Sequence, residues 1–338
     1  MITARQMVAL LQSLNDGDDE QFYAIALQVA ASEAKRGRVE VATELQSQVD
    51  FARARKSAQP RLQSNRTGRV VAFTKPRGEL QSLLSTSSPK TSLSELILDE
   101  NLASRLRNIV LQQKQRDRLR EHTRSPKSKL LLIGPPGCGK TFTATALAGE
   151  LHLPLHAIRL DAIISRFMGE TASKLRLIFD QIASERAVYL FDEFDAIGGK
   201  RTSDNDVGEM RRVLNSFLQF LEEANSTDSL IIAATNHPEL LDPALLRRFD
   251  DVLIYPLPSA EMIPTLLNDR LSHFKTRLAD WHHVTAAAAG LSQAEIVKAA
   301  DDVVRNAILD RETCISEVQL LDALEHRRQL LDVLQTSK

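Results

Sequence analysis

The chain has 338 residues, of which 43% are hydrophobic and 26% charged, so it can form roughly two or three domains with cores of their own. Its 43 lysines and arginines against 44 aspartates and glutamates give a formal net charge of -1, which argues against a protein that coats a polyanion. Because Cys138 and Cys314 are its only cysteines, the sequence excludes a disulfide framework and a cluster of cysteine metal ligands.

Three helices are predicted in the first 57 residues, at positions 2–14, 18–36 and 38–56. The second and third carry apolar residues at three- and four-residue spacing, which favours a small antiparallel bundle. We identify no acid, base or ligand cluster there, so 1–57 is expected to dock a partner or client; the alternative is that it only caps the next domain. The apolar positions are Phe22, Ile25, Ala26, Val29, Ala30, Val41, Leu45, Val49 and Ala52.

A flexible linker is predicted over 58–92, because this stretch is rich in Ser, Thr, Gln, Arg and Pro and has little periodicity. Helical patterning returns at 93–97 and 102–120. The basic stretch 112–129 indicates either a nucleic-acid surface or a solvated helix face, and the interleaved Asp117 and Glu121 favour the second interpretation.

Apolar runs alternate with helical segments from residue 129 onward, as expected of parallel strands that are buried on both faces. We therefore predict an α/β domain over 93–258, in which helices cover both faces of a parallel sheet. Strand signals largely stop after residue 258, and 259–338 is predicted to be a smaller helical domain. The strands are expected at 130–133, 155–160, 187–191, 230–235 and 252–255, and the later helices at 259–274, 286–289, 292–309 and 316–334.

A phosphate-binding loop of the pattern G-x-x-x-x-G-K-[ST] follows the first apolar run. Its glycines let backbone N–H groups wrap phosphate oxygens, and the helix that follows directs its positive end at them. Lys140 is expected to neutralise the β- and γ-phosphates, and Thr141 to offer its hydroxyl to Mg²⁺. The expected nucleotide contacts are Gly134, Pro135, Pro136, Gly137, Cys138, Gly139, Lys140, Thr141 and Phe142.

Two carboxylates end the buried run at 187–191, where α/β sheets place their ligands. Asp192 is expected to hold Mg²⁺, and Glu193 to orient and activate a water for attack on the γ-phosphate. The alternative is a strand end that enters a turn; the phosphate loop upstream favours the catalytic interpretation.

Three further polar residues are candidates for the same chemistry. Asn236 ends the next apolar run and is either an amide that bonds the attacking water and the γ-phosphate, or a turn residue before Pro238. Adjacent arginines are usually solvated, but Arg247 and Arg248 have the planar cation that transition-state charge requires, and a neighbouring subunit can supply it. That interpretation implies a head-to-tail ring, since each subunit must offer different surfaces to its two neighbours.

Together these segments resemble the AAA clade of the AAA+ superfamily. The resemblance implies a Mg²⁺-dependent ATPase that forms a hexameric ring, with a P-loop sheet domain, a helical lid and nucleotide at the subunit interface. It further implies Asn236 as the first sensor and both Arg247 and Arg248 as arginine fingers. Here the arginines are adjacent, as in katanin- and spastin-like members, whereas many relatives separate them by Pro-Gly, so which one contacts the γ-phosphate stays open. The resemblance covers about 93–334 and rests on 134–141, 191–193, 233–238 and 241–250.

Two more segments resemble the pore loops of this clade, which grip a threaded polypeptide. In the first, Phe167 and Met168 beside Gly169 offer an apolar, sequence-tolerant grip on a mobile hinge. Burial of Phe167 in the core is the alternative. The polar, glycine-containing segment 203–209 occupies the place of a second pore loop.

The start of the helix expected at 292–309 resembles the lid motif of this clade, which places Gly and a small residue near the nucleotide. This resemblance implies that Gly290, Ser292 and Ala294 contact the nucleotide. The motif departs at Gln293, which is usually Gly. Taken alone, the same residues predict a helix N-cap in which Ser292 and Glu295 form a capping box.

The function expected from the whole set is ATP-driven remodelling, unfolding or threading of a protein client by a homo-oligomeric ring. Compact bacterial AAA proteins of this layout resemble AAA proteins that act beside a separate subtilisin-like protease, including in phage defence. The chain itself contains neither of the protease motifs H-E-x-x-H and G-x-S-x-G. One alternative is a nucleic-acid machine, such as a clamp loader or initiator, against which the neutral charge argues. Another is an ATP-dependent switch or scaffold, against which the intact catalytic set argues.

We expect a cytoplasmic protein with no membrane partner. The N-terminal residues lack the basic-then-apolar order of a secretion signal. No apolar stretch approaches the ~18 residues that a membrane-spanning helix needs.

Overall fold

A six-stranded sheet forms the centre of the structure, a computed structural model that describes residues 78–163, 168–198, 204–223, 227–277 and 280–336. The strand order is β1-β3-β4-β5-β2-β6, and every pair is parallel except β1 with β3. Parallel pairing aligns the carboxyl ends of β2, β4 and β5, where the functional residues are expected. The strands are β1 (Leu84–Ser87), β2 (Lys129–Ile133), β3 (Leu155–Ile158), β4 (Val188–Phe191), β5 (Leu230–Thr235) and β6 (Asp251–Ile254).

The five parallel strands lie within a residue or two of the predicted apolar runs, because continuous burial selects continuous apolar sequence. All residues of β4 and β5 are buried. The prediction of a purely parallel sheet was wrong at β1, an antiparallel edge strand that lies inside the predicted linker 58–92. In β1 only Leu84 is buried, so its Leu-Ser-Thr-Ser sequence carries no apolar run to signal a strand.

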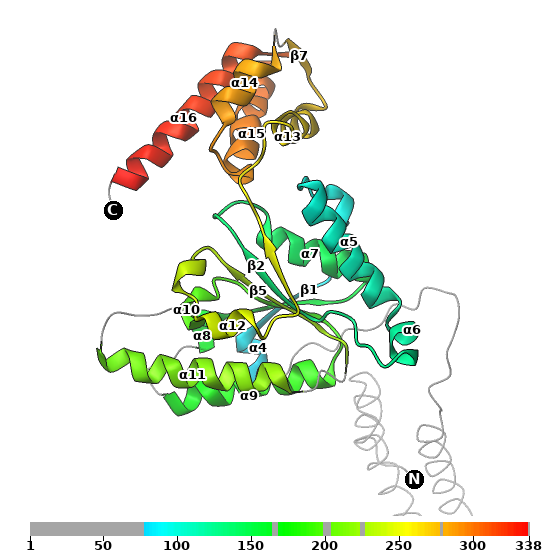
Figure 1. Cartoon of the computed structure of the whole chain (residues 1–338). Coiled ribbons are helices and arrows are strands. Elements are labelled where there is room, and N and C mark those ends of the chain that lie inside the picture. The colour runs from blue at the N-terminus through cyan, green and yellow to red at the C-terminus, as the bar shows by residue number, and fades with distance from the viewer. Residues whose placement is uncertain (1–77, 164–167, 199–203, 224–226, 278–279, 337–338) are drawn as a thin grey trace, which may run out of the picture. The chain divides into compact units, whose positions relative to one another are not determined.

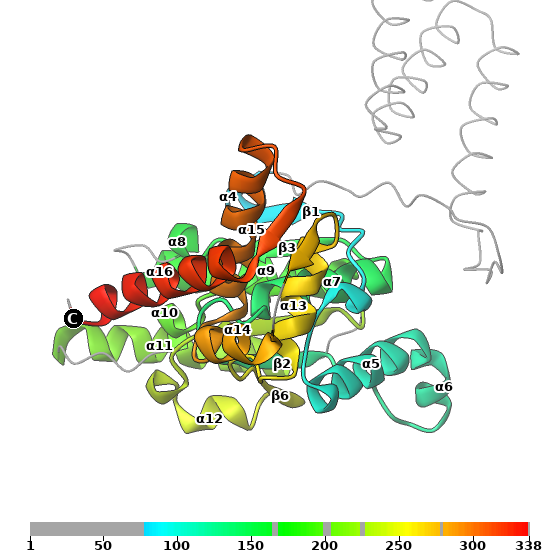
Figure 2. The ribbon, with the colours of Figure 1, turned by 90° about the horizontal axis from the view of Figure 1, so that it is seen from above.

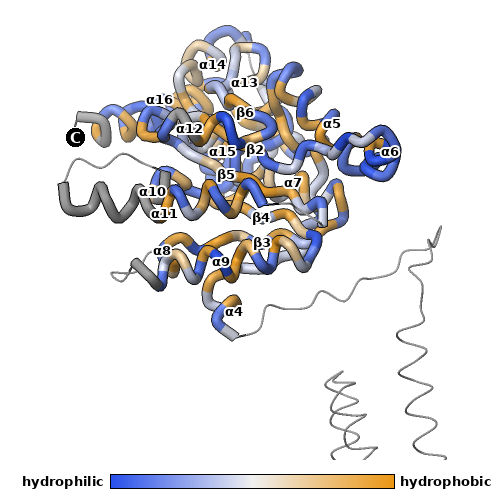
Figure 3. The backbone as a smooth tube through the Cα atoms, turned by 60° about the horizontal axis from the view of Figure 1, so that its bottom comes forward, coloured by the Kyte–Doolittle hydropathy of each residue, from blue (hydrophilic) through white to orange (hydrophobic). Residues whose placement is uncertain are grey.

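Helices cover both faces of the sheet, as predicted (Figure 1). On one face, α5 and α7 pack on the strands through a core that includes Leu106, Leu147 and Leu190. On the other, α9 and α11 enclose a core rich in phenylalanine, in which Phe179, Phe191 and Phe217 make ring contacts. Hydrophobic and hydrophilic residues alternate along α9 and α11 in Figure 3, as expected of helices with one buried face. These helices are α5 (Glu100–Lys114), α7 (Lys140–Leu151), α9 (Met168–Ser184) and α11 (Asp204–Glu222).

Shorter helices connect these elements. One of them, α4, lies with β1 in the predicted linker and buries Leu83. The helix expected at 102–120 is interrupted at Gln115, where α5 gives way to α6. The connecting helices are α4 (Glu79–Leu83), η1 (Leu93–Glu95), α6 (Arg116–Glu121), α8 (Leu160–Ile163), α10 (Asp195–Gly198), η2 (Pro238–Leu240) and α12 (Pro243–Leu246).

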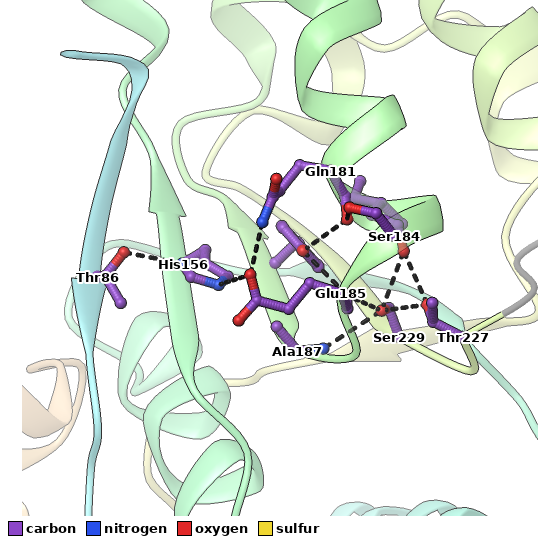
Figure 4. A network of polar contacts seen from close by, with 10 residues as sticks. Thr86, His156, Gln181, Ser184, Glu185, Ala187, Thr227 and Ser229 are labelled. Carbon is purple, nitrogen blue, oxygen red and sulfur yellow. Dashed lines mark hydrogen bonds and ion pairs between the residues drawn. The ribbon is translucent and has the colours of Figure 1, made fainter. Parts of the chain in front are cut away.

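A polar network holds β1 to the sheet (Figure 4). The Thr86 hydroxyl lies 2.9 Å from Nδ1 of His156, which is fully buried in β3. Nε2 of the same ring lies 3.9 Å from a Glu185 carboxylate oxygen, and Gln181 donates to that oxygen at 2.5 Å. Burial lowers the pKa of His156 and raises the pKa of Glu185. The edge strand is therefore attached by polar contacts in addition to its backbone bonds.

A helical lid follows the sheet, also as predicted; Figure 2 views it from above. Its core joins all four lid helices through residues such as Leu267, Val284, Val303 and Leu324. The sequence predicts few strands after residue 258, but the lid contains two short parallel strands, each of only three residues, too short to form an apolar run. The lid elements are α13 (Met262–Leu271), β7 (Lys275–Arg277), α14 (Trp281–Ala288), α15 (Gln293–Leu309), β8 (Cys314–Ser316) and α16 (Glu317–Thr336).

Three further sequence predictions concern the N-terminal bundle, the second pore loop and the absence of a membrane-spanning helix. The three-helix bundle at 1–57 lies outside the described residues. The segment expected to form the second pore loop, 203–209, is helical from Asp204 onward. It forms the first part of the strongly amphipathic helix α11. Among the described helices, none combines the length and apolarity required to cross a bilayer.

Candidate nucleotide-binding site

The predicted phosphate loop connects the end of β2 to the start of α7. Gly134 is held against β6 so closely that an added Cβ would lie 2.2 Å from the carbonyl oxygen of Tyr255. Gly139 caps α7 in the left-handed region, with φ 89°, which a residue with a side chain rarely adopts. Glycine is thus required at both positions, by close approach at one and by backbone conformation at the other.

Lys140 is the first residue of α7, and its side chain turns back into the loop. Only 6% of its surface is exposed. Nζ donates to the carbonyl oxygens of Gly134 at 2.6 Å and Pro135 at 2.7 Å, and to Oδ1 of Asn236 at 2.7 Å. Burial lowers the pKa of Lys140, while nearby groups that include Asp192 oppose this shift. The loop therefore holds one cation among oxygen acceptors, next to the candidate sensor.

The candidate magnesium ligands touch each other. The Thr141 hydroxyl donates to Oδ2 of Asp192 at 2.6 Å, and the other carboxylate oxygen accepts from the backbone N–H of Glu193 at 3.0 Å. A hydroxyl and a carboxylate are hard oxygen donors of the kind that Mg²⁺ takes beside phosphate oxygens. The two predicted ligands therefore lie in contact with each other and offer oxygen atoms of the type that Mg²⁺ takes.

Glu193 follows Asp192 directly after β4 and is exposed. Its φ of 51° places it in the left-handed region, which is uncommon for a residue other than glycine. The next residue, Phe194, donates its backbone N–H to Ala234 of β5 at 2.8 Å and is fully buried. This anchor turns the chain sharply after β4 and leaves the Glu193 side chain in the cavity described next.

One cavity of about 450 Å³ collects most of the predicted residues. Asn236, at the end of β5, is brought to it together with the phosphate loop and both carboxylates. Phe142 lines it as well and is 44% exposed. The predicted residues that line the cavity are Pro136, Gly137, Gly139, Lys140, Thr141, Phe142, Asp192, Glu193, Asn236 and Ala294.

Five predicted nucleotide contacts do not line this cavity: Gly134, Pro135, Cys138, Gly290 and Ser292. Gly134 and Pro135 instead present carbonyl oxygens to Lys140. Cys138 is buried in the core beneath the loop, and burial raises the pKa of its thiol. Gly290 supplies the left-handed turn before α15, with φ 85°.

The rest of the lining comes from two regions, the segment around η1 that precedes α5 and the inner side of lid helices α13 and α15. Of these, the sequence indicates only the start of α15, through the resemblance of this stretch to the lid motif. The η1 segment and α13 carry no local signal for ligand binding, since their side chains meet only after folding. The residues of both regions are Glu95, Leu96, Ile97, Leu266, Asp269, Arg270, Gln293 and Val297.

The lid also contacts the phosphate loop directly. The backbone N–H of Ala294 donates to the Gly137 carbonyl at 3.0 Å. Ser292 caps α15 by accepting from the Glu295 N–H at 3.4 Å. Half of the predicted capping box is therefore present, whereas the Glu295 carboxylate turns to Lys298 and Arg327.

The two candidate arginine fingers follow α12 and lie away from this cavity. Both are exposed, and neither is among the residues that line the cavity in its own chain. Arg248 forms an ion pair with Glu222, the last residue of α11. Of the first pore loop, Phe167 lies outside the described residues, while Met168 and Gly169 begin α9.

Comparisons with known proteins agree on one family. A model of the ATPase family associated with various cellular activities (AAA) matches residues 130–257. An uncharacterized AAA family ATPase, y4kL, of Sinorhizobium fredii is 31% identical over 309 residues, which cover 91% of this chain and 91% of that protein.

Two relatives with descriptive names are matched over part of their length. The proteasome-activating nucleotidase of Pyrococcus furiosus is 35% identical over 208 residues, 59% of this chain and 52% of that protein. The ATP-dependent zinc metalloprotease FtsH of Helicobacter felis is 30% identical over 276 residues, 78% of this chain and 42% of that protein. The chain thus spans about half of the first and less than half of the second.

Proposed function

Because the chain belongs to the AAA family of ATPases, we propose that it hydrolyses ATP in a ring of identical subunits and uses the energy to remodel a protein client. One observation carries the ATPase part. The cavity brings together a cation, a hydroxyl–carboxylate pair, a further carboxylate and an amide, drawn from the ends of β2, β4 and β5. These are the groups that phosphoryl transfer to water requires.

In this proposal each group has one role. Lys140 binds the β- and γ-phosphates, Thr141 and Asp192 hold Mg²⁺, and Asn236 bonds the γ-phosphate and the attacking water. Glu193 orients that water and accepts its proton. When bound, Mg²⁺ would neutralise charge on the phosphate oxygens.

A ring, which we propose to be hexameric, is supported by the arginines. Both are exposed and neither lines the cavity of its own chain, which fits a finger that serves the neighbouring subunit. Each subunit would then place Arg247 or Arg248 at the next site, and the contacts would close head to tail.

A protein client is supported by two of the relatives. Their names, a proteasome-activating nucleotidase and an ATP-dependent protease, connect this type of ATPase module with proteolysis. We propose that Phe167, with Met168 and Gly169, grips the client in the pore, and that residues 1–57 recruit it in the cytoplasm. We further propose a separate protease, of the subtilisin-like type also found in phage defence, as the partner that would receive an unfolded client.

The test uses Glu193→Gln, which should bind ATP but hydrolyse it at least a hundredfold more slowly, since it lacks the general base. In ATP, this variant should retain clients, which can be identified after nuclease treatment. Wild-type protein should then unfold the recovered client. Unfolding is measured as the loss of the fluorescence signal that depends on the client's tertiary structure. Phe167→Ala should keep the ATPase rate and lose the unfolding.

Three outcomes would refute the proposal. Wild-type hydrolysis by Glu193→Gln would remove the assigned base. Retention of nucleic acid alone would favour the clamp-loader or initiator alternative, and ATP turnover without any change in the recovered protein would favour a switch or scaffold.

A further inference from the structure

Gln293 is the first residue of α15, and its side chain crosses to the other wall of the cavity. Nε2 donates to the backbone carbonyl of Ile97 at 3.0 Å, across 196 positions in the chain. A carbonyl oxygen only accepts hydrogen bonds, so the NH₂ group of the carboxamide must face Ile97. Its Oε1 is then directed toward the phosphate loop, 3.4 Å from where a Cβ on Gly139 would lie.

The segment that Gln293 reaches is fixed to the sheet domain. Its 3₁₀ helix, η1, is closed by a capping box between Ser92 and Glu95. Ser92 also donates to Glu150 of α7 at 3.3 Å, and Lys114 of α5 donates to the same carboxylate at 2.9 Å. The hydrogen bond from Lys114 lowers the pKa of Glu150, so this carboxylate is ionised at neutral pH.

Two consecutive residues thus attach the lid to two walls of one cavity. Ala294 bonds the phosphate loop through its backbone, which any residue at that position could do. Gln293 bonds the 96–97 wall through its side chain, which the glycine usual at this place in the motif could not do. The second attachment is therefore a property of this particular sequence.

We infer that Gln293 is a positioning residue that sets the affinity of the cavity for ATP, by holding the lid against the 96–97 wall. The inference rests on the proposed function. A lid that is fixed beforehand does not have to be ordered when the nucleotide binds, so less binding energy is lost. The bond should affect the binding step and leave the groups that react with water unchanged.

The test compares three variants with wild-type protein. Gln293→Ala removes the side chain, and Gln293→Met keeps much of its volume without the donor. Lys298→Ala is the control, on the same helix and half-exposed, and within the described part of the chain its ion pair is with Glu295. Dissociation constants for ATP and ADP are measured by calorimetry, and KM and kcat by phosphate release.

Both Gln293 variants should bind nucleotide about three- to tenfold more weakly, as expected for the loss of one partly buried hydrogen bond. KM for ATP should rise by a similar factor, with kcat within twofold of wild type. Lys298→Ala should behave like wild-type protein in both assays.

Normal affinity in Gln293→Met together with weak binding in Gln293→Ala would show that packing, and not the hydrogen bond, matters, and would overturn the inference. A fall in kcat without a rise in KM would also overturn it. Wild-type protein that binds no ATP would instead refute the proposed function, and with it the inference.

Discussion

Gly137→Ala tests the contact between the lid and the phosphate loop. Gly137 has φ +78°, and a Cβ built on it would lie 2.6 Å from the Ser292 hydroxyl oxygen and 2.9 Å from the Cβ of Ala294. The hydroxyl can rotate away only by giving up its cap on α15. The Ala294 Cβ can move only with the backbone of the helix, so the lid must shift.

The expected cost has two parts. The left-handed backbone costs an alanine about 1 kcal/mol relative to glycine. Loss of the Ser292 cap and of the Ala294–Gly137 hydrogen bond costs about 1 kcal/mol each. The two lost contacts together amount to about 2 kcal/mol. Because they hold the lid against the phosphate loop, their loss should weaken ATP binding about thirtyfold. The backbone part should appear in the free energy of unfolding.

Gly78→Ala is the control for a glycine at positive φ, because Gly78 has φ +66° and no heavy atom within 4 Å of the added Cβ. Its ψ of -138° lies outside the left-handed helical region, so the variant should lose about 1–3 kcal/mol of unfolding free energy in urea denaturation and bind ATP normally. The double variant Gly137→Ala, Ala294→Gly removes one of the two colliding atoms and should regain part of the lost affinity. Binding by Gly137→Ala within threefold of wild type, or no recovery in the double variant, would refute the lid contact as the cause.

Three further experiments test the ring, an ion pair and a close packing contact. Mixtures of Arg248→Ala with Lys140→Ala subunits should regain part of the ATPase activity, because every interface at which a Lys140→Ala subunit serves the site of an Arg248→Ala subunit pairs an intact loop with an intact finger. Asp251→Asn should lower the unfolding free energy by about 2 kcal/mol at pH 7, since Asp251 is nearly buried and accepts from Lys127 at 2.7 Å. Gly149→Ala should cost about 1–3 kcal/mol in the same assay by overpacking, since its Cβ would lie 2.1 Å from a backbone carbonyl oxygen of the segment before η1.

The effect of Asp251→Asn should depend on pH in one direction. Burial raises the pKa of Asp251, but hydrogen bonds from Lys127 and Arg105 outweigh it, and the net shift is downward. The ionised carboxylate therefore contributes stability above the unfolded pKa of about 3.9, and this is lost as the pH falls through the lower folded pKa. The difference in stability between wild type and variant should therefore shrink as the pH falls below about 3.9, and a difference that stays constant at acid pH would contradict this.

The other two predictions have equally definite failures. No recovery in the subunit mixture, with rings intact by size-exclusion chromatography, would point to a role for Arg248 within its own subunit. Its ion pair with Glu222 would then be the contact to examine. Unchanged stability of Gly149→Ala would show that the segment before η1 is not held against α7.

The sequence predicted the parts of the fold that depend on continuous apolar runs. β2, β4 and β5 are buried along their whole length or nearly so, and their residue types alone indicate this. β1 was not predicted, because an edge strand with one buried leucine has no such run. Its Thr86 contacts a histidine of β3 that lies 70 positions further along the chain. A pattern within a short stretch of sequence cannot indicate a pairing between residues that far apart.

The same division holds for the site. Its phosphate end is made of consecutive residues whose chemistry can be read from their order, and Lys140, Thr141 and Asp192 lie together as predicted. Its other end is made of residues from η1, α13 and α15 that are far apart in the chain. Leu96, Leu266 and Val297 are ordinary apolar helix or loop residues until the lid folds over the loop.

This division of the site has a consequence for coupling. The phosphate end is built on the sheet, whereas the opposite end combines the lid with a segment that η1 and Glu150 tie to α7. A nucleotide that fills both ends must therefore contact the first turn of α7 and the 96–97 wall. That wall is in turn attached to the part of α7 near Glu150. Any change in the lid on hydrolysis would act on the segment that leads back to β1 and residues 1–77. In our proposal, this is the physical route by which ATP turnover would reach a client held by the N-terminal residues.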